Sequence, residues 1–203
     1  MTLRISATDI DSYRRFRGDE EEDLATFLAR LRKWEPPTPA MKAGTALHKA
    51  LEKATPGQYL TLEADGYTFE IRGTNALDLP DIRECKATRE YEIGGLTVTV
   101  VGKVDAVHGN RIDDHKFTGR FDAERFLDSY QWRIYLEVFG ADEFRWNVFE
   151  GNEVGDKQYV ISAVHPLRTF RYPGIGADVE RELGLFTEFA KAHLPERINK
   201  DAA

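Results

Sequence analysis

Cysteine is almost absent from the sequence, and Cys85 is its only representative among 203 residues. A lone cysteine cannot form an intrachain disulfide, and it excludes a multi-cysteine zinc site or a four-cysteine iron–sulfur cluster within one chain. A metal ion bound by this chain must therefore take oxygen and imidazole ligands.

Long apolar runs are also missing, because no stretch of about 18 apolar residues occurs. Residues Met1 to Ile5 lack the extended apolar stretch of a secretory signal. We therefore expect a cytoplasmic protein that is neither exported nor inserted in a membrane. The apolar fraction of 41% is enough for one substantial core, so residues 1–203 are expected to form a single domain.

The chain has no excess of basic residues, since 28 Lys and Arg stand against 35 Asp and Glu and the formal net charge is −7. This balance argues against a protein that coats nucleic acid through a basic surface. It leaves nucleic-acid chemistry open, because an enzyme that holds Mg²⁺ needs carboxylates at its centre. Six arginines are either phosphate contacts or ordinary solvated charges: Arg14, Arg15, Arg17, Arg120, Arg125 and Arg133.

Five segments carry the apolar spacing of amphipathic helices. The first opens at Ser6–Asp9, which offers N-cap chemistry, and places Ile10, Tyr13 and Phe16 on one face. The other predicted helices cover residues 19–34, 39–54, 122–139 and 177–193. The N-terminal helices, at about 6–35, are expected to pack on or beside the core.

Alternating or β-branched apolar runs predict strands over residues 67–71, 87–93, 96–107, 111–117, 144–150 and 158–164. Gly94-Gly95 and Gly109-Asn110 are turn signals, so the strands beside them are expected to pair antiparallel. The polar tail after Pro195 is predicted to fray. This order of elements predicts an α/β fold with a central mixed β-sheet flanked by helices.

The turn Gly109-Asn110 brings two carboxylates together if it is the two-residue loop of a β-hairpin. Cross-strand partners then have numbers that sum to 219, so Asp105 lies opposite Asp114. Paired Cβ atoms on such a ladder are about 5 Å apart. Two carboxylates at that spacing call for a divalent cation between them.

Lys116 follows Asp114 by two residues and shares its face, because side chains alternate along a strand. A carboxylate pair beside a lysine suits phosphodiester hydrolysis, in which a metal ion binds the phosphate and the ammonium binds the water or the developing charge. The alternative is that Asp113 and Asp114 are merely the solvent face of a strand. Asp105 argues against it, because a carboxylate inside the apolar run 98–107 should be paired or metal-bound.

His48 lies on the apolar face of the predicted helix 39–54, where a histidine is either a core residue with one hydrogen bond or a ligand. Gly44, one turn earlier, favours a ligand, because a glycine inside a helix costs about 1 kcal/mol relative to alanine and relieves crowding where backbone or ligand passes. Glu52, one turn later, either holds a metal-bound water or faces solvent.

Gln131 and Tyr135 are four residues apart on the predicted helix 122–139 and share a face. They either form the edge of the core or order Lys116 and the substrate backbone. Their spacing alone leaves both interpretations open.

Four short motifs occur in a fixed order: Gly44-x-x-x-His48, Gly102-x-x-Asp105, Asp114-x-Lys116 and Gln131-x-x-x-Tyr135. In that order and on those elements, they resemble the RecB-like branch of the PD-(D/E)XK nuclease superfamily, which includes phage-type exonucleases. The opening segment from Ile5 to Tyr13 is similar to the start of many members. The resemblance covers roughly Ser6 through Tyr135 and implies the restriction-endonuclease-like αβββαβ core.

The resemblance implies a role for each matched residue. The metal ligands would be His48, Asp105, Asp114 and the backbone carbonyl of His115. The catalytic lysine would be Lys116, acting with Asp105 and Asp114. The accessory motif, which supports the active site and DNA positioning, would be Gln131 and Tyr135, with Gly44 and Glu52 as further accessory candidates.

The implied activity is hydrolysis of DNA phosphodiester bonds with one or two Mg²⁺ or Mn²⁺ ions, by an exonuclease rather than an endonuclease. The implied setting is recombination, repair or phage DNA processing in a bacterial or phage-infected cell, with a recombination protein as a candidate partner. Ala106 departs from the family, which frequently has arginine there, and the missing cysteines imply that no iron–sulfur cluster is held.

Two other classes of function remain open. One is a nucleic-acid-binding or assembly module that keeps the fold without cutting, which the acidic net charge favours. The other is a metal-dependent phosphatase or small-nucleotide hydrolase.

Overall fold

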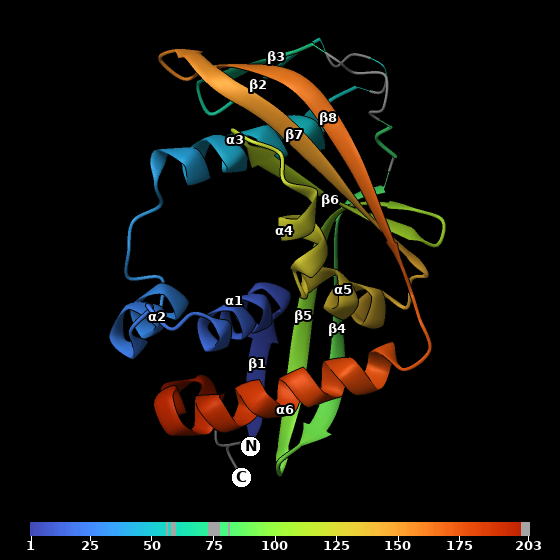
Figure 1. Ribbon diagram of the computed structural model, residues 1–203. Coiled ribbons are helices and arrows are strands. Elements are labelled where there is room, and N and C mark those ends of the chain that lie inside the picture. Colours follow the sequence, from blue (N-terminus) through green and yellow to red (C-terminus); the bar gives the residue numbers. More distant parts are fainter. Residues whose placement is uncertain (56, 58–59, 73–77, 81, 200–203) are drawn as a thin grey trace.

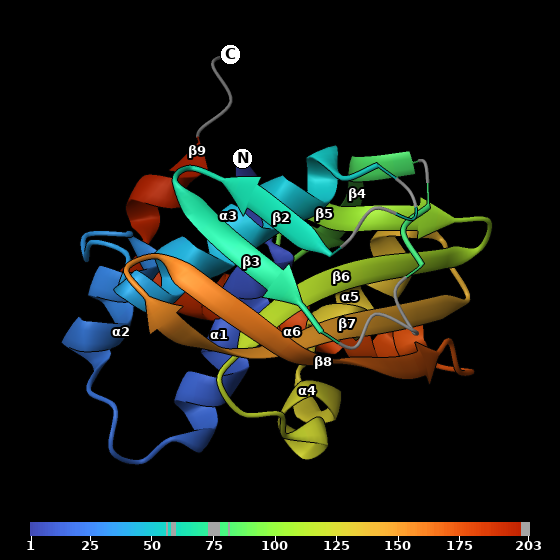
Figure 2. The same cartoon turned by 90° about the horizontal axis from the view of Figure 1, so that it is seen from above.

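The computed structural model describes residues 1–55, 57, 60–72, 78–80 and 82–199. Within this part, nine strands form one mixed sheet in the order β2-β3-β8-β7-β6-β5-β1-β9, with β4 paired to β5 (Figures 1 and 2). The strands are β1 (Thr2–Ser6), β2 (Thr61–Ala64), β3 (Tyr67–Ile71), β4 (Ile82–Ile93), β5 (Leu96–His108), β6 (Arg111–Thr118), β7 (Glu143–Gly155), β8 (Gln158–Phe170) and β9 (Ile198–Asn199).

Helices pack on the sheet and divide its apolar contacts into two clusters (Figure 1). The main core includes Val98 and Trp146 and lies where α1, α5 and α6 contact β1, β4 and β5. The α3 cluster includes Leu47 and Phe149 and lies where α3 contacts β2, β3 and β6. The helices are α1 (Ala7–Gly18), α2 (Leu24–Leu31), α3 (Pro39–Lys53), α4 (Ala123–Asp128), α5 (Gln131–Phe139) and α6 (Ile175–His193).

The predicted opening helix is confirmed as α1, and Ser6 is its N-cap. The backbone N–H of Asp9 donates to Ser6 Oγ at 3.2 Å, and the N–H of Ser6 donates to Asp9 Oδ2 at 3.0 Å. This reciprocal capping satisfies two amides that a helix start leaves free. Strand β1, directly before α1, was not predicted, because its partner β5 lies almost a hundred residues away.

The helix predicted over residues 19–34 is shorter than expected, since α2 spans only Leu24–Leu31. Asp23 is its N-cap, and Asp23 Oδ1 accepts the backbone N–H groups of Ala25 at 2.9 Å and Thr26 at 3.0 Å. The acidic residues before Asp23 therefore lie outside the helix instead of in its first turn.

The helix predicted over residues 122–139 is divided into α4 and α5. The break occurs where Asp11 of α1 reaches the connection between them. Asp11 Oδ1 accepts the N–H of Tyr130 at 2.6 Å and the hydroxyl of Ser129 at 3.0 Å. A carboxylate from another helix thus ends one helix and starts the next, which the local sequence pattern does not show.

The C-terminal segment is also more ordered than predicted. A 3₁₀ turn at Pro195–Arg197 leads into β9, in which Ile198 pairs with Leu3 of β1. The expected fraying is therefore wrong for residues 195–199, and the rest of the tail lies outside the described residues. None of the described helices has the length and apolar content needed to cross a membrane.

The predicted antiparallel arrangement of three strands is confirmed as β4, β5 and β6. Gly94, Gly95 and Gly109 occupy the left-handed region at φ 58°, 77° and 58°, as their tight turns require. Between β5 and β6 the pairs run from His108–Arg111 to Ala106–Asp113. Their numbers sum to 219, so the register is as predicted.

Asp105 is the one residue of β5 that no described ladder pairs. On one edge, β5 pairs with β1 along Thr97–Val101 and with β6 only from Ala106 onward. On the other edge, β4 pairs with every residue of β5 from Leu96 to Val107 except Asp105. The expected pair of Asp105 with Asp114 is therefore not part of the ladder.

Gly102 allows α5 to pack closely on β5, because a Cβ atom there would lie 2.8 Å from Phe139 Cε2. We expect Gly102→Val to lower the free energy of unfolding by about 1–3 kcal/mol through overpacking, as measured by urea denaturation. Gly184→Ala is the matched control, since an added Cβ on α6 meets nothing within 4 Å. It should raise the free energy of unfolding by about 0.5–1 kcal/mol. Wild-type stability in Gly102→Val would contradict this packing.

Candidate active site

His48 on α3 and Asp105 on β5 form a partly buried ion pair. His48 Nδ1 lies 2.9 Å from Asp105 Oδ1, and Asp105 Oδ2 accepts the backbone N–H of His115 at 2.5 Å. Burial alone would lower the pKa of His48, but the hydrogen bond and charge of Asp105 raise it above its ordinary value. Burial alone would raise the pKa of Asp105, but the hydrogen bond and charge of His48 lower it to about 2. The pair therefore favours imidazolium and carboxylate.

Asp114 on β6 is buried and less well compensated. Burial raises its pKa to about 6, and the negative charge of Asp105 adds to this effect, while Lys116 opposes it. Lys116 Nζ lies 2.6 Å from Asp114 Oδ2, which is an ion-pair distance. The contact lacks hydrogen-bond geometry, so Asp114 Oδ2 has no hydrogen-bond partner. Asp114 is thus a desolvated carboxylate that would gain from further positive charge.

His115 follows Asp114 in β6, and its backbone N–H donates to Asp105. Its side chain lies away from these carboxylates, against the α3 cluster. The His115 ring packs edge-on against Phe149 of the α3 cluster, with ring centroids 5.8 Å apart. Burial lowers the pKa of His115 to about 4. The side chain is therefore a neutral core group.

The chemistry of this donor set fits a hard divalent cation, because carboxylate oxygens predominate and Asp114 Oδ2 is buried without a hydrogen bond. The donors are not arranged as a finished cage. Across the part of the chain that the structure describes, no three His, Cys, Asp or Glu side chains form a metal-binding group. The imidazole of His48 is instead bound to Asp105, and the ammonium of Lys116 is paired with Asp114.

Gln131 and Tyr135 face each other on α5 as their spacing predicts. Gln131 Nε2 donates to the Tyr135 hydroxyl at 2.7 Å, and both side chains are buried. Burial and the charge of Asp114 raise the pKa of Tyr135 above its ordinary value. Gln131 also lines a cavity of about 210 Å³ together with Arg15, Lys116, Arg125, Phe126, Ser129 and Trp146. Tyr135 thus belongs to the main core, and Gln131 lies at its edge in the cavity that Lys116 also lines.

Gly44 and Glu52 make no recorded side-chain contact with His48, Asp105 or Asp114 among the described residues. A Cβ atom at Gly44 would meet nothing within 4 Å, so this glycine relieves no crowding with the described protein. Glu52 is exposed, and its backbone carbonyl accepts Arg83 Nη1 at 3.0 Å. The expectation that Gly44 makes room for a neighbouring backbone is therefore wrong.

Asp113 is not a solvent-facing residue, which corrects the alternative interpretation of Asp113 and Asp114. Its side chain is fully buried, Arg145 Nη2 lies 2.5 Å from Asp113 Oδ2, and Arg111 Nε lies 2.9 Å from Asp113 Oδ1. Adjacent carboxylates in β6 thus have different surroundings, because Asp113 has two guanidinium partners and Asp114 has one ammonium.

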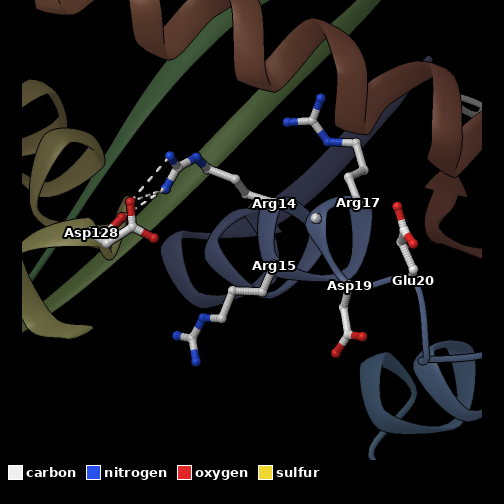
Figure 3. A pocket seen from close by; sticks show the side chains of 7 residues that line it. Arg14, Arg15, Arg17, Asp19, Glu20 and Asp128 are labelled. Atoms are coloured by element: carbon white, nitrogen blue, oxygen red, sulfur yellow. Dashed lines mark hydrogen bonds and ion pairs between the residues drawn. The ribbon is translucent and has the colours of Figure 1, made fainter. Parts of the chain in front are cut away.

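A second cavity, of about 680 Å³, lies at the C-terminal end of α1, and neither Asp105 nor Asp114 lines it (Figure 3). Its lining residues are Arg14, Arg15, Arg17, Gly18, Asp19, Glu20 and Asp128. Figure 3 shows that the three arginine side chains point in different directions. Each pairs with an acid: Arg14 with Asp128, Arg15 with Asp11 and Arg17 with Glu182. Their charges are therefore largely used within the protein.

Sequence reasoning missed three residues that position the site. Asp11 holds the start of α5, as described above, and Arg83 of β4 holds the end of α3. Trp146 of β7 makes a cation–π contact with Lys116, because Lys116 Nζ lies 5.2 Å from the centroid of the Trp146 ring. The four-residue spacing of Asp11 and Arg15 was the only local signal, because long-range contacts leave no periodic pattern.

Comparison with protein-family models finds no match for the sequence, and comparison with curated proteins finds none either. Solved structures do match in fold. A crystal structure of SSO0001 has a TM-score of 0.56 at 18% identity, and the match covers 93% of this chain and 77% of that chain. A crystal structure of LHK-Exo in complex with dAMP has a TM-score of 0.51 at 13% identity, covering 95% and 90%.

A further crystal structure, of the alkaline exonuclease LHK-Exo from Laribacter hongkongensis, has a TM-score of 0.47 at 14% identity and covers 95% of this chain and 90% of that chain. The likeness to SSO0001 and to the dAMP complex is one of fold. The protein is thus a single α/β domain with a large mixed sheet flanked by helices, as the sequence predicted.

In metal-free protein, the raised pKa of Asp114 predicts that stability decreases as pH rises. A group whose pKa is raised from 3.8 to about 6 on folding stabilises the fold below the lower value and loses that contribution through the higher one. Between about pH 4 and pH 7, wild type should lose about 1–3 kcal/mol relative to Asp114→Asn. Urea denaturation in EDTA measures this difference.

Asp113→Asn is the matched comparison for this experiment. It leaves Arg145 buried beside a neutral amide, so it should lower the free energy of unfolding by about 3–5 kcal/mol at both ends of the pH range. A difference between wild type and Asp114→Asn that stays constant with pH would show that Asp114 is not a desolvated carboxylate.

Proposed function

We propose that this protein is a metal-dependent DNA nuclease that hydrolyses phosphodiester bonds, and that it acts as an exonuclease rather than an endonuclease. The observation that carries the proposal is that a buried carboxylate paired with an ammonium lies within electrostatic reach of a partly buried carboxylate paired with an imidazole. Asp105 contacts His48, and Asp114 contacts Lys116. The fold shared with LHK-Exo, whose crystal structure contains dAMP, supports nucleotide chemistry at this site.

Asp105, Asp114 and His48, with the backbone carbonyl of His115, would hold one or two Mg²⁺ or Mn²⁺ ions. When bound, such ions polarise the scissile phosphate and lower the pKa of a bound water. Hard cations are favoured because these donors are mainly oxygen atoms. The buried Asp114 Oδ2, which has no hydrogen bond, supports this assignment.

Lys116 would position the attacking water or offset the charge that develops on the phosphate. The side chains of Lys116 and Gln131 both line the cavity of about 210 Å³. Gln131, held by Tyr135, would keep that wall in place for the substrate. Arg125 lines the same cavity and would favour a polyanionic substrate over a neutral one, whereas the charge of Arg15, which also lines it, is paired with Asp11.

The same proposal extends to a role in recombination, repair or phage DNA processing, in which a recombination protein would be the partner. This setting is supported by the sequence motifs and the exonuclease-like fold together. It would place the protein in the cytoplasm of a bacterial or phage-infected cell.

A cleavage assay tests the proposed function with linear duplex, single-stranded and circular DNA in Mg²⁺, Mn²⁺ or EDTA. We expect metal-dependent release of mononucleotides from linear DNA, intact circular DNA, and no cleavage in EDTA, because the carboxylates need a cation to act on phosphate. DNA binding without cleavage would support a non-cutting module instead. Turnover of mononucleotides without polymer cleavage would support a phosphatase.

Lys116→Ala should reduce cleavage by about 10²–10⁴-fold, because the ammonium acts in the chemical step. The midpoint of thermal unfolding should also fall, because the buried Asp114 loses its ammonium partner, so cleavage is compared at a temperature at which circular dichroism shows both proteins folded. Lys49→Ala is the matched control, because Lys49 is an exposed lysine next to His48 and pairs with Asp65. Equal activity in wild type and Lys116→Ala would remove this lysine from the mechanism.

A further inference from the structure

Glu84 of β4 has a backbone conformation that strands do not normally contain. Its φ is +56°, in the left-handed region that disfavours side chains such as glutamate. It lies opposite Asp105, and this is the one pair missing between Arg83–Ala106 and Cys85–Val104. The numbers of the pairs on both sides sum to 189, so the ladder is interrupted without any change of register.

The alternation of side chains changes phase at this interruption. Val98, Val100 and Val104 of β5 belong to the main core, which fits a period of two. Beyond Asp105, Val107 packs against the same core, three residues after Val104. Even-numbered side chains of β5 therefore face the main core before Asp105, and the odd-numbered Val107 faces it afterwards.

The partner strand changes phase at the same place. Cys85 packs against the main core, whereas the Arg83 side chain reaches α3. Arg83 Nη1 donates to three carbonyl oxygens at the C-terminal end of α3: Leu51 at 2.8 Å, Glu52 at 3.0 Å and Ala54 at 2.7 Å. The last carbonyls of a helix lack partners within it, and within the described residues the only other backbone bond recorded for these three is from the N–H of Ala54 to the carbonyl of Leu51 at 3.3 Å. The phase change thus allows β4 to hold the helix that carries His48.

The same interruption leaves Asp105 without a described ladder partner on β4 or β6. Its carboxylate accepts from His48 on α3 and from the N–H of His115 on β6. In an uninterrupted ladder, Asp105 would share one face with Lys103 and the other odd-numbered residues before it. The Glu84 side chain forms an ion pair with Lys103 of β5, and this contact stabilises the left-handed backbone of Glu84.

We propose that Glu84 is a positioning residue whose left-handed backbone aims Asp105 at the cation site and Arg83 at α3. This inference rests on the proposed function, because it assigns Asp105 to a metal-binding role. Strained backbone persists where the surroundings over-determine it, and it concentrates at active sites. Here the surroundings are the ion pair with Lys103 and the anchored end of α3.

The test compares substitutions that differ in their tolerance of a left-handed backbone. Glu84→Gly and Glu84→Asn accept positive φ, so they should keep cleavage of linear DNA within about threefold of wild type. Glu84→Val is β-branched and rejects it. It should lower kcat by about 10- to 100-fold with little change in KM, and should weaken Mn²⁺ binding in calorimetry.

Glu90→Val is the matched control, because Glu90 is exposed on β4 and pairs in regular register with Thr99. It should leave kcat and Mn²⁺ affinity unchanged. Full activity in Glu84→Val would overturn the inference. Equal losses in Glu84→Gly and Glu84→Val would also overturn it, because the side chain and not the backbone would then be responsible.

A crystal structure of Glu84→Val separates this inference from the proposed function. We expect Asp105 to enter the β4–β5 ladder and to move away from His48, whether or not the protein cuts DNA. An unchanged interruption in that variant would overturn the inference. A wild type that neither binds Mn²⁺ nor cleaves DNA, together with a closed ladder in Glu84→Val, would overturn the nuclease proposal and retain the positioning role.

Discussion

The carboxylate of Asp105 on β5 contacts both α3 and β6, the other two elements that carry residues of the candidate site. A charge that is largely removed from solvent must be paired or hydrogen-bonded, and the partly buried Asp105 meets this requirement with groups from two other elements. His48 brings α3 to the sheet, and the N–H of His115 brings the edge of β6. Because the ladder omits Asp105, its carboxylate is free to make both contacts. Asp105 thus adds polar contacts to the apolar packing of Phe117 of β6 against the α3 cluster.

Other buried acids of the protein are compensated more completely than Asp114. Asp113 has two guanidinium partners, Glu137 pairs with Arg89 and Arg171, and Asp11 accepts two hydrogen bonds in addition to Arg15. Asp114 has the ammonium of Lys116 at ion-pair distance and the negative charge of Asp105 nearby. Incomplete compensation is costly in a structural residue and useful in a residue that binds a cation. The surroundings of Asp113 are thus those of a structural carboxylate, and those of Asp114 are consistent with the cation-binding role that we propose for it.

Local elements of the fold were predicted well because their signals are local. The caps and apolar spacing of α1 and α3 lie within a few residues, and the glycine turns define the β4–β5–β6 arrangement. The errors occur where a distant group decides. Asp11 divides the helix predicted over 122–139, and β5 and β9 give β1 its place in the sheet. Neither effect leaves a periodic trace in the segment that it changes.

The sequence by itself determined the register of the hairpin that carries Asp114 and Lys116, and the contact between Gln131 and Tyr135 on one face of α5. Turn type and alternation act over a few residues, so they can be read without the rest of the chain. Only the tertiary structure decided that Asp105 leaves the ladder, that Asp113 is buried with Arg145, and that β4 anchors α3. These outcomes depend on burial and on contacts between remote segments, in which the cost of a desolvated charge or a strained backbone is balanced by partners far away in the chain.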